Sequence, residues 1–488
     1  MGGVGPAIFG AGSRPANQMD LVSAGRGLLG LTAILALAFA LSSDRKAINW
    51  RTVGVGLALQ LTFAVLVLMG DTLGDIFAPL GWVAVGFAWF ASLFVVFLGY
   101  VTDGASFIFG PLALAPGVEG SLGFYFFSQV LPTIIVFSSL MSVLYYLGIM
   151  QRVVRAMAWV VSRAMRTSGP ESLSVTANVF VGQTEAPLVI RPYLKSMSRS
   201  ELLAVMTGGM ATIAGGVMAS YIQFLGQRYS DATGVVLEIG QQLFATNLLG
   251  ASVMAAPAAL VLAKILIPET KPVAPLPIRP ASEEEARAAI TADPVVPALG
   301  SEHVAEEITD PSVDTAPRNV IDAAAGGAAD GLKLALNVGA MLIAFIALIA
   351  LINGLLDWGA GLFGYTTSLE RILGVVLAPM AWLIGVPNAD ITAFGSLVGQ
   401  KLVLNEFVGY LALADAIEAG ALQPKTVIMA TFALCGFANF SSIAIQIGGI
   451  GPLAPERTGE LAQLGLRAVL AGTLANLMTA TIAGAMLG

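Results

Sequence analysis

Four consecutive residues bring polar, potentially reactive side chains into a hydrophobic stretch of this sequence. Gly182, Gln183, Thr184 and Glu185 bring an amide, a hydroxyl and a carboxylate together between apolar neighbours. Each such group costs several kcal/mol if it is left unpaired in lipid. The cluster therefore needs a hydrogen-bonding partner, and we expect the surrounding chain to be organised around it.

The residues on both sides of this cluster predict its topology. Both flanks are basic, with Arg163, Arg166, Arg191, Lys195 and Arg199. The positive-inside rule then places both ends in the cytoplasm, so the segment enters and leaves the membrane on one side. With Gly182 and Pro187 to interrupt the helix, we predict a re-entrant hairpin over residues 170–192. Its polar tip is tolerated at mid-membrane depth only where it is buried in protein or lines a cavity.

A second interrupted apolar segment, residues 388–411, carries polar side chains near its middle: Gln400, Lys401, Asn405 and Glu406. Its flanks are acidic rather than basic, and we expect Asp390 at its entrance to cap a helix. Counting the spans that precede it places both of its ends outside. We therefore predict a second hairpin that enters from the opposite face.

The composition indicates an all-α polytopic membrane protein. Of 488 residues, 56% are hydrophobic and 11% are charged, and the mean hydropathy is +0.82. Soluble proteins carry about 25% charged residues. A single cysteine, Cys435, excludes internal disulfides, and the single histidine, His303, lies in a polar loop. The net charge of −7 comes largely from one acidic loop, and no nucleic-acid partner is predicted.

Apolar length and charge predict eight transmembrane helices. The expected spans are residues 27–42, 52–70, 128–149, 202–224, 237–265, 332–356, 425–447 and 463–487. Residues 79–101 are also apolar, but a span there would place the arginines of Gln151–Met165 outside, against the positive-inside rule. We therefore predict interfacial helices at 79–101 and 365–386, and a basic amphipathic helix over Gln151–Met165 on the cytoplasmic surface.

These segments divide the chain into six predicted parts. In order they are a polar tail (1–26), scaffold spans with an interfacial helix (27–150), a first repeat with its hairpin (151–266), an acidic Pro-rich cytoplasmic loop (267–330), a scaffold span (331–357) and a second repeat with its hairpin (358–488). The loop is expected to be a solvated linker, with a regulatory segment as the alternative.

The two halves also share a short motif. Val181-Gly182-Gln183 recurs as Val398-Gly399-Gln400, and each copy precedes an intramembrane glutamate. Each then continues into a span that is interrupted midway, at Thr212–Gly216 and at Gly436–Ser442. Interrupted segments in corresponding halves, entering from opposite faces, are typical of an inverted-repeat transporter with its site at the midplane.

Four stretches resemble signatures of the concentrative nucleoside transporter family. They are Asn178-Val-Phe-Val-Gly-Gln-Thr-Glu-Ala-Pro-Leu, Met206-Thr-Gly-Gly-Met-Ala-Thr-Ile-Ala-Gly-Gly, Lys401-Leu-Val-Leu-Asn-Glu-Phe and Cys435-Gly-Phe-Ala-Asn-Phe-Ser-Ser. The resemblance runs from about residue 130 to the end. It implies a homotrimer in the cell (inner) membrane, with eight spans and two re-entrant hairpins in each subunit, that imports nucleosides with a cation.

The resemblance also implies roles for particular residues. Gln183, Thr184 and Glu185 would face the nucleobase, Val217 and Phe437 would pack against it, and Glu406, Asn439 and Ser442 would bind the ribose hydroxyls. Amides and carboxylates suit such a ligand because each buried group left unpaired costs about 1–3 kcal/mol. The pair Gly182-Gln183 resembles that of family members which accept both purine and pyrimidine nucleosides.

For the coupling ion the resemblance implies sodium, held by Asn178, Thr212 and the carbonyl groups of Val181 and Ile213. Sodium is a hard cation that takes several oxygen ligands, and broken helices supply them. The alternative is that Asn178 caps a half-helix and Thr212 bonds back to its own backbone. Proton coupling through Glu185 or Glu406 is the rival mechanism. No enzymatic cofactor is predicted.

The same residues also allow other functions. Glu185 and Glu406 are also the residues that an intramembrane enzyme would use as an acid/base pair. They would have a structural role if they capped half-helices or paired with Lys401. A passive channel is the third alternative, and two opposed hairpins do not favour it.

Overall fold

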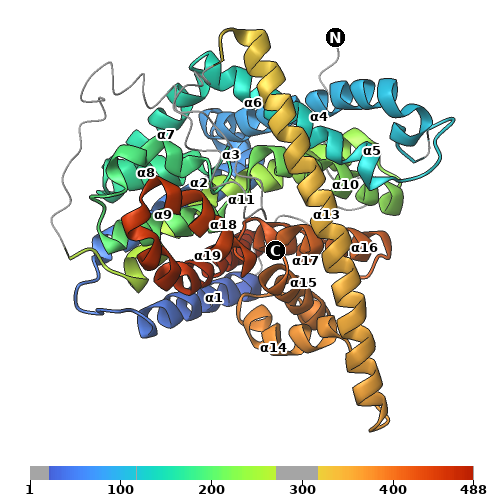
Figure 1. Ribbon diagram of the computed structural model, residues 1–488. Coiled ribbons are helices and arrows are strands. Elements are labelled where there is room, and N and C mark those ends of the chain that lie inside the picture. The colour runs from blue at the N-terminus through green and yellow to red at the C-terminus, as the bar shows by residue number, and fades with distance from the viewer. Residues whose placement is uncertain (1–20, 117, 271–316, 487–488) are drawn as a thin grey trace.

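The computed structural model describes the chain except for residues 1–20, 117, 271–316 and 487–488, and the described part is built of helices (Figure 1). In the first half these are α1 (Leu21–Ala40), α2 (Trp50–Leu68), α3 (Gly70–Ile76), α4 (Ala78–Phe109), η1 (Gly110–Ala113), α5 (Phe126–Gln129), α6 (Leu131–Tyr146), α7 (Ile149–Met165), α8 (Gly169–Ala177), η2 (Ala186–Tyr193), α9 (Arg199–Ala211), α10 (Gly215–Thr233) and α11 (Leu237–Leu266). In the second half they are α13 (Val320–Gly361), α14 (Leu369–Leu383), η4 (Asn388–Asp390), α15 (Ile391–Val403), α16 (Glu406–Glu418), α17 (Pro424–Leu434), α18 (Ser441–Ile450), η5 (Gly451–Leu453), η6 (Pro455–Arg457) and α19 (Thr458–Met486).

The predicted all-α membrane architecture is confirmed. Within the described residues, eight helices are long and apolar enough to cross a membrane. One expected span, 425–447, is divided into α17 and α18 and does not count among the eight. The eighth candidate is instead the region of α4, a continuous helix of 32 residues. Length and apolar composition would allow α4 to span, so its interfacial position remains a prediction from charge.

Two boundaries differ from the sequence-based expectation. Helix α1 begins at Leu21, inside the predicted tail, and α13 begins at Val320, inside the predicted loop 267–330. Small residues explain the second difference: a Cβ added at Gly327 would lie 2.6 Å from Cβ of Ser142 in α6. Close packing of this kind stabilises a helix that composition alone marks as a loop. Residues 271–316 of that loop, and the tail before Leu21, lie outside the described residues.

The first hairpin consists of α8, a turn at residues 178–185, and the 3-10 helix η2. A capping box begins α8, in which Glu171 N donates to Ser168 Oγ and Ser168 N donates to Glu171 Oε1 at 2.7 Å. The helix ends at Ala177, before Gly182, so the prediction that Gly182 and Pro187 interrupt it was wrong in detail. Both prolines of the second arm, Pro187 and Pro192, lie within η2.

The second hairpin consists of α15 and α16, which pack against each other. The turn falls at Leu404 and Asn405, where Asn405 Oδ1 accepts a hydrogen bond from Val408 N at 2.9 Å and so caps α16. Its second arm continues to Glu418, beyond the predicted end at residue 411. Asp390, which was expected to cap a helix, lies at the N-cap position of α15, but its side chain makes no capping hydrogen bond to that helix. Its Oδ2 accepts from Gln423 N and Thr426 Oγ1, at the start of α17.

Both halves repeat one order of elements: a hairpin, a broken helix and a long helix. Helices α9 and α10 are separated at residues 212–214, and α17 and α18 at residues 435–440. The long helices α11 and α19 then pack against each other. The shared Val-Gly-Gln motif has different structures in the two copies, since Gly182 lies in the turn and Gly399 lies inside α15. Figure 1 shows α13, the longest helix, crossing the front of this assembly.

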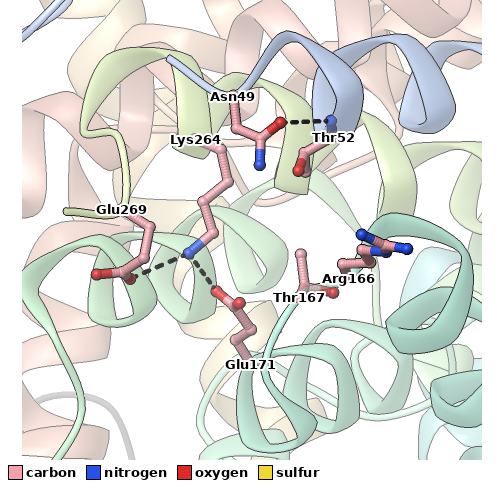
Figure 2. A pocket seen from close by; sticks show the side chains of 7 residues that line it. All are labelled: Asn49, Thr52, Arg166, Thr167, Glu171, Lys264 and Glu269. Atoms are coloured by element: carbon pink, nitrogen blue, oxygen red, sulfur yellow. Dashed lines mark hydrogen bonds and ion pairs between the residues drawn. The ribbon is translucent and has the colours of Figure 1, made fainter. Parts of the chain in front are cut away.

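A buried ionic network holds the base of the first hairpin. Figure 2 shows Lys264 of α11 reaching between Glu171 and Glu269. Its Nζ lies 2.7 Å from Glu171 Oε2 and 3.5 Å from Glu269 Oε2, and it donates to Ser200 Oγ at 3.1 Å. The cavity beside it is lined by Asn49, Thr52, Arg166, Thr167, Glu171, Lys264 and Glu269. The network thus ties α8 to α11 and α9.

Candidate functional site

Backbone hydrogen bonds join the four irregular segments in series. In the first hairpin, Phe180 O accepts from Gly215 N of the first broken helix at 3.0 Å. Thr212 O of that helix accepts from Phe437 N of the second broken helix at 3.3 Å. Phe440 N in turn donates to Leu402 O of the second hairpin at 3.2 Å. The two hairpins and the two helix breaks therefore meet at one place.

Glu406 lies at the centre of a buried polar network. Its Oε1 accepts from Tyr221 Oη at 3.1 Å and its Oε2 accepts from Asn439 Nδ2 at 3.1 Å. Asn439 Oδ1 accepts from Ser442 N at 2.8 Å and from Ser441 Oγ at 2.7 Å. Each carboxylate oxygen has a second lone pair, so Glu406 retains capacity to accept further hydroxyl donors.

Gln183 connects the first hairpin to the same network. Its Nε2 donates to Ser442 Oγ at 3.1 Å, and its Oε1 accepts from Gln446 Nε2 at 3.1 Å. Gln446 Nε2 also lies 2.9 Å from Met206 O in α9. The approach of α9 requires a glycine, because a Cβ at Gly209 would lie 2.8 Å from Cβ of Gln183. Gln183, Ser442, Asn439 and Glu406 therefore form one continuous chain of contacts.

The other residues predicted to bind the substrate lie around this chain in different ways. Thr184 packs against Gly449 of α18, where an added Cβ would lie 2.5 Å from Cγ2 of Thr184. Val217 is buried in α10, and Phe437 is half-buried in the second break. Glu185 folds back to accept from Gly182 N at 3.2 Å. Glu185 and Glu406 therefore belong to separate hydrogen-bond networks in the described part of the chain, which does not favour an acid/base pair.

The segments that carry the predicted sodium ligands are adjacent, because of the bond from Gly215 N to Phe180 O. Asn178 Nδ2 donates to Ser174 O at 3.0 Å, and Thr212 Oγ1 donates to Gly208 O at 2.9 Å. Such local bonds were expected if Asn178 and Thr212 have only a structural role. Both side chains act as donors in them, however, so their oxygens can still accept or bind a cation. The oxygen Asn178 Oδ1 is buried and has no hydrogen-bond partner. A buried acceptor without a donor fits a hard cation that takes oxygen ligands.

Within the part of the chain that the structure describes, Lys401 forms no ion pair with a glutamate, so the alternative in which Glu185 or Glu406 pairs with Lys401 was wrong. The side chain is 1% exposed. Its Nζ donates to Ala433 O at 3.0 Å and to Asn476 Oδ1 at 2.6 Å. Lys401 therefore binds the end of α17, where the broken helix leaves its carbonyl groups without intrahelical donors.

Sequence reasoning missed three residues of this region: Tyr221, Gln446 and Asn476. The last two are isolated amides inside apolar segments, and polar residues within membrane spans are often functional. This signal could have identified Gln446 and Asn476 from the sequence. Tyr221 carries no comparable signal, because a tyrosine in a packed helix is usually part of the core and only its partner Glu406 distinguishes it.

Family models match most of the chain. Residues 29–112 match the Na+ dependent nucleoside transporter N-terminus, residues 127–228 match Nucleoside recognition, and residues 247–484 match the Na+ dependent nucleoside transporter C-terminus.

Relatives and solved structures that match nearly the full length of the chain agree with the family models. Nucleoside permease NupC of Helicobacter pylori is 39% identical, over 94% of this chain and 97% of that protein. An uncharacterized transporter of Haemophilus influenzae is 45% identical, over 94% and 97%. The structure of CNTnw in an inward-facing substrate-bound state is similar with a TM-score of 0.76 and 40% identity, covering 95% of this chain and 98% of that one. A CNTnw variant in an outward-facing state gives 0.78 and 40%, covering 95% and 97%. The resemblance seen in the sequence is thereby confirmed: the chain belongs to the family of Na+-dependent nucleoside transporters, which are multi-pass proteins of the cell membrane and not enzymes.

Proposed function

We propose that the chain imports nucleosides into the cell together with sodium, by alternating access, and that the network from Gln183 to Glu406 binds the nucleoside. The observation that carries this proposal is the chain of contacts through Ser442 and Asn439, which unites the first hairpin with the second. A ligand bound there touches both hairpins at once. Binding can therefore favour one arrangement of the two halves over another.

The ribose would lie beside Glu406, Asn439 and Ser442, and the base beside Gln183, Thr184 and Glu185. In this structure the first group of side chains bond to one another. The nucleoside hydroxyls would donate to the free lone pairs of the Glu406 carboxylate, beside the bonds that Tyr221 and Asn439 already make to it. Hydrogen bonds to a charged acceptor are worth about 1.5–3 kcal/mol, which makes Glu406 the main source of ribose affinity.

Sodium would be held by Asn178 and Thr212, with the carbonyl oxygens of Val181 and Ile213. The unpartnered Asn178 Oδ1 supports this assignment. Sodium there would neutralise the partial charges of four oxygens at the junction of the first hairpin and the first broken helix. We further propose that the protein is a homotrimer and accepts both purine and pyrimidine nucleosides.

The test is concentrative uptake by proteoliposomes. Labelled uridine and adenosine are offered at fixed pH with a sodium gradient, with choline replacing sodium, and with an imposed pH gradient alone. Accumulation of unchanged nucleoside that needs sodium supports the proposal. Undiminished accumulation in choline that follows the pH gradient would replace sodium by protons. Chemical conversion of the nucleoside would support an enzyme instead.

A further inference from the structure

Asn476 of α19 touches both broken helices with a single amide group. Its Nδ2 donates to Ala211 O, the last residue of α9, at 2.6 Å. The same nitrogen donates to Cys435 O, just after α17, at 2.5 Å. The side chain is 1% exposed. Each helix break thus has one carbonyl group bound to the same donor.

The other atom of this amide is held by the second hairpin. Asn476 Oδ1 accepts from Lys401 Nζ at 2.6 Å, and Lys401 also donates to Ala433 O. A buried ammonium group is costly unless its protons are bound. The fixed lysine therefore orients the amide, with Oδ1 toward α15 and Nδ2 toward the two breaks.

The two helix breaks and α19 pack in close contact. Gly436 adopts φ +148°, a conformation that disfavours other residues. A Cβ there would lie 2.7 Å from Ala211 O and 2.7 Å from Asn476 Oδ1. One turn earlier in α19, a Cβ on Gly472 would lie 2.9 Å from Met210 Cβ and 3.1 Å from Ala438 Cβ. Any displacement of one break must therefore move Asn476 or the other break.

The two carbonyl groups border the two binding sites. Ala211 directly precedes Thr212 and Ile213, which are assigned to sodium, and Cys435 lies shortly before Phe437 and Asn439, which are assigned to the nucleoside. Thr212 O also accepts from Phe437 N. A shift of the α9 break when sodium binds would reach the nucleoside site through two parallel links, one backbone bond and one amide.

We propose that Asn476, oriented by Lys401, couples the sodium site to the nucleoside site as a positioning residue. This inference rests on the proposed function. Coupling between sites is reciprocal, so sodium must tighten nucleoside binding by the factor by which nucleoside tightens sodium binding. That factor is typically about 5-fold to 150-fold. A merely structural asparagine would alter stability and leave the factor unchanged.

The experiment measures the dissociation constant of labelled uridine on the purified full-length protein in nanodiscs, at low and at saturating sodium. The ratio of the two constants is the coupling factor. It is compared in the wild type, in Asn476→Asp, which keeps the acceptor for Lys401 and loses the donor to both breaks, and in Gly472→Ala, which forces α19 away without deleting a hydrogen bond. Asn247→Asp is the matched control, because Asn247 is a buried amide of α11 whose Nδ2 has no hydrogen-bond partner.

We expect the ratio to fall toward 1 in Asn476→Asp, to fall less in Gly472→Ala, and to stay at the wild-type value in Asn247→Asp. The ratio of the half-saturating sodium concentrations without and with uridine should fall by the same factor. An unchanged ratio in Gly472→Ala, or in a folded Asn476→Asp, would overturn the inference. A wild-type ratio of 1 would instead contradict sodium coupling itself, so failure of the proposed function is distinguishable from failure of this step.

Discussion

At the scale of single residues, the site is built from polar groups that satisfy one another. Glu406 binds Tyr221 and Asn439, and Gln183 binds Ser442 and Gln446. The sequence identified the residue types, because an amide or a carboxylate within an apolar segment is conspicuous. It did not identify the partners, since Tyr221 and Gln446 lie far from Glu406 and Gln183 along the chain. Spatial pairing of this kind follows from the packing of broken helices and not from local sequence.

The proposed sodium site allows a residue-scale prediction. If Thr212 is a sodium ligand, replacing it by valine removes one oxygen at nearly constant shape. The sodium concentration that gives half-maximal uridine uptake should then rise by about 10-fold, which corresponds to an interaction as strong as one hydrogen bond. Thr431→Val is the control, because Thr431 is also buried and bonds back to Val427 O at 2.8 Å. Equal sodium dependence in the two variants would exclude Thr212 as a ligand.

At the scale of elements, both halves contain a hairpin and a broken helix, and the sequence predicted that order. The interruptions at Thr212–Gly216 and Gly436–Ser442 coincide with real helix breaks because glycine and polar residues gather there. The repeated Val-Gly-Gln motif was less informative. It lies in a turn in one half and inside α15 in the other, so three matching letters did not indicate equivalent geometry. How deep each hairpin lies in the membrane stays a prediction from flanking charge.

The ionic network at the base of the first hairpin gives an element-scale prediction. Lys264→Met leaves Glu171 buried without its cation, and the loss of one partner of a buried pair costs about 3–5 kcal/mol. The apparent Tm of the purified protein should fall clearly, and the added substitution Glu171→Gln should restore part of it. Lys333→Met is the control, since the pair of Lys333 with Asp330 is largely exposed and worth about 0–1 kcal/mol. Equal changes in Tm for the two lysine variants would contradict this role.

At the scale of the whole molecule, hydropathy alone was sufficient to predict a helical membrane protein. It did not predict the true length of α13, whose first turns pack on α6 through small residues. Nor does hydropathy decide whether α4 spans the membrane, because its length and apolar composition would allow a span while the flanking charges predict an interfacial helix. Long helices with exposed apolar faces, such as α13, must be covered by lipid or by another copy of the chain.

The proposed homotrimer is tested at this scale. We expect native mass spectrometry of the protein, extracted in a mild detergent, to give a mass of three chains. Cysteine cross-linking at exposed positions of α13, in membranes, should give the same trimer without extraction. The matched control is a cysteine on an exposed position of α1. A monomeric mass together with cross-linking that is no stronger from α13 than from α1 would contradict a trimer formed through this helix.

The most direct test of the assigned nucleoside site compares uridine with 2′,3′-dideoxyuridine in wild-type protein and in Glu406→Gln. If Glu406 accepts the ribose hydroxyls, the variant should lose uridine affinity by about 10-fold to 100-fold, the equivalent of a charge-assisted hydrogen bond. It should bind the dideoxynucleoside as the wild type does, because that ligand lacks the hydroxyls. A loss of equal size for both ligands, or wild-type uridine affinity in a folded Glu406→Gln, would contradict the assignment.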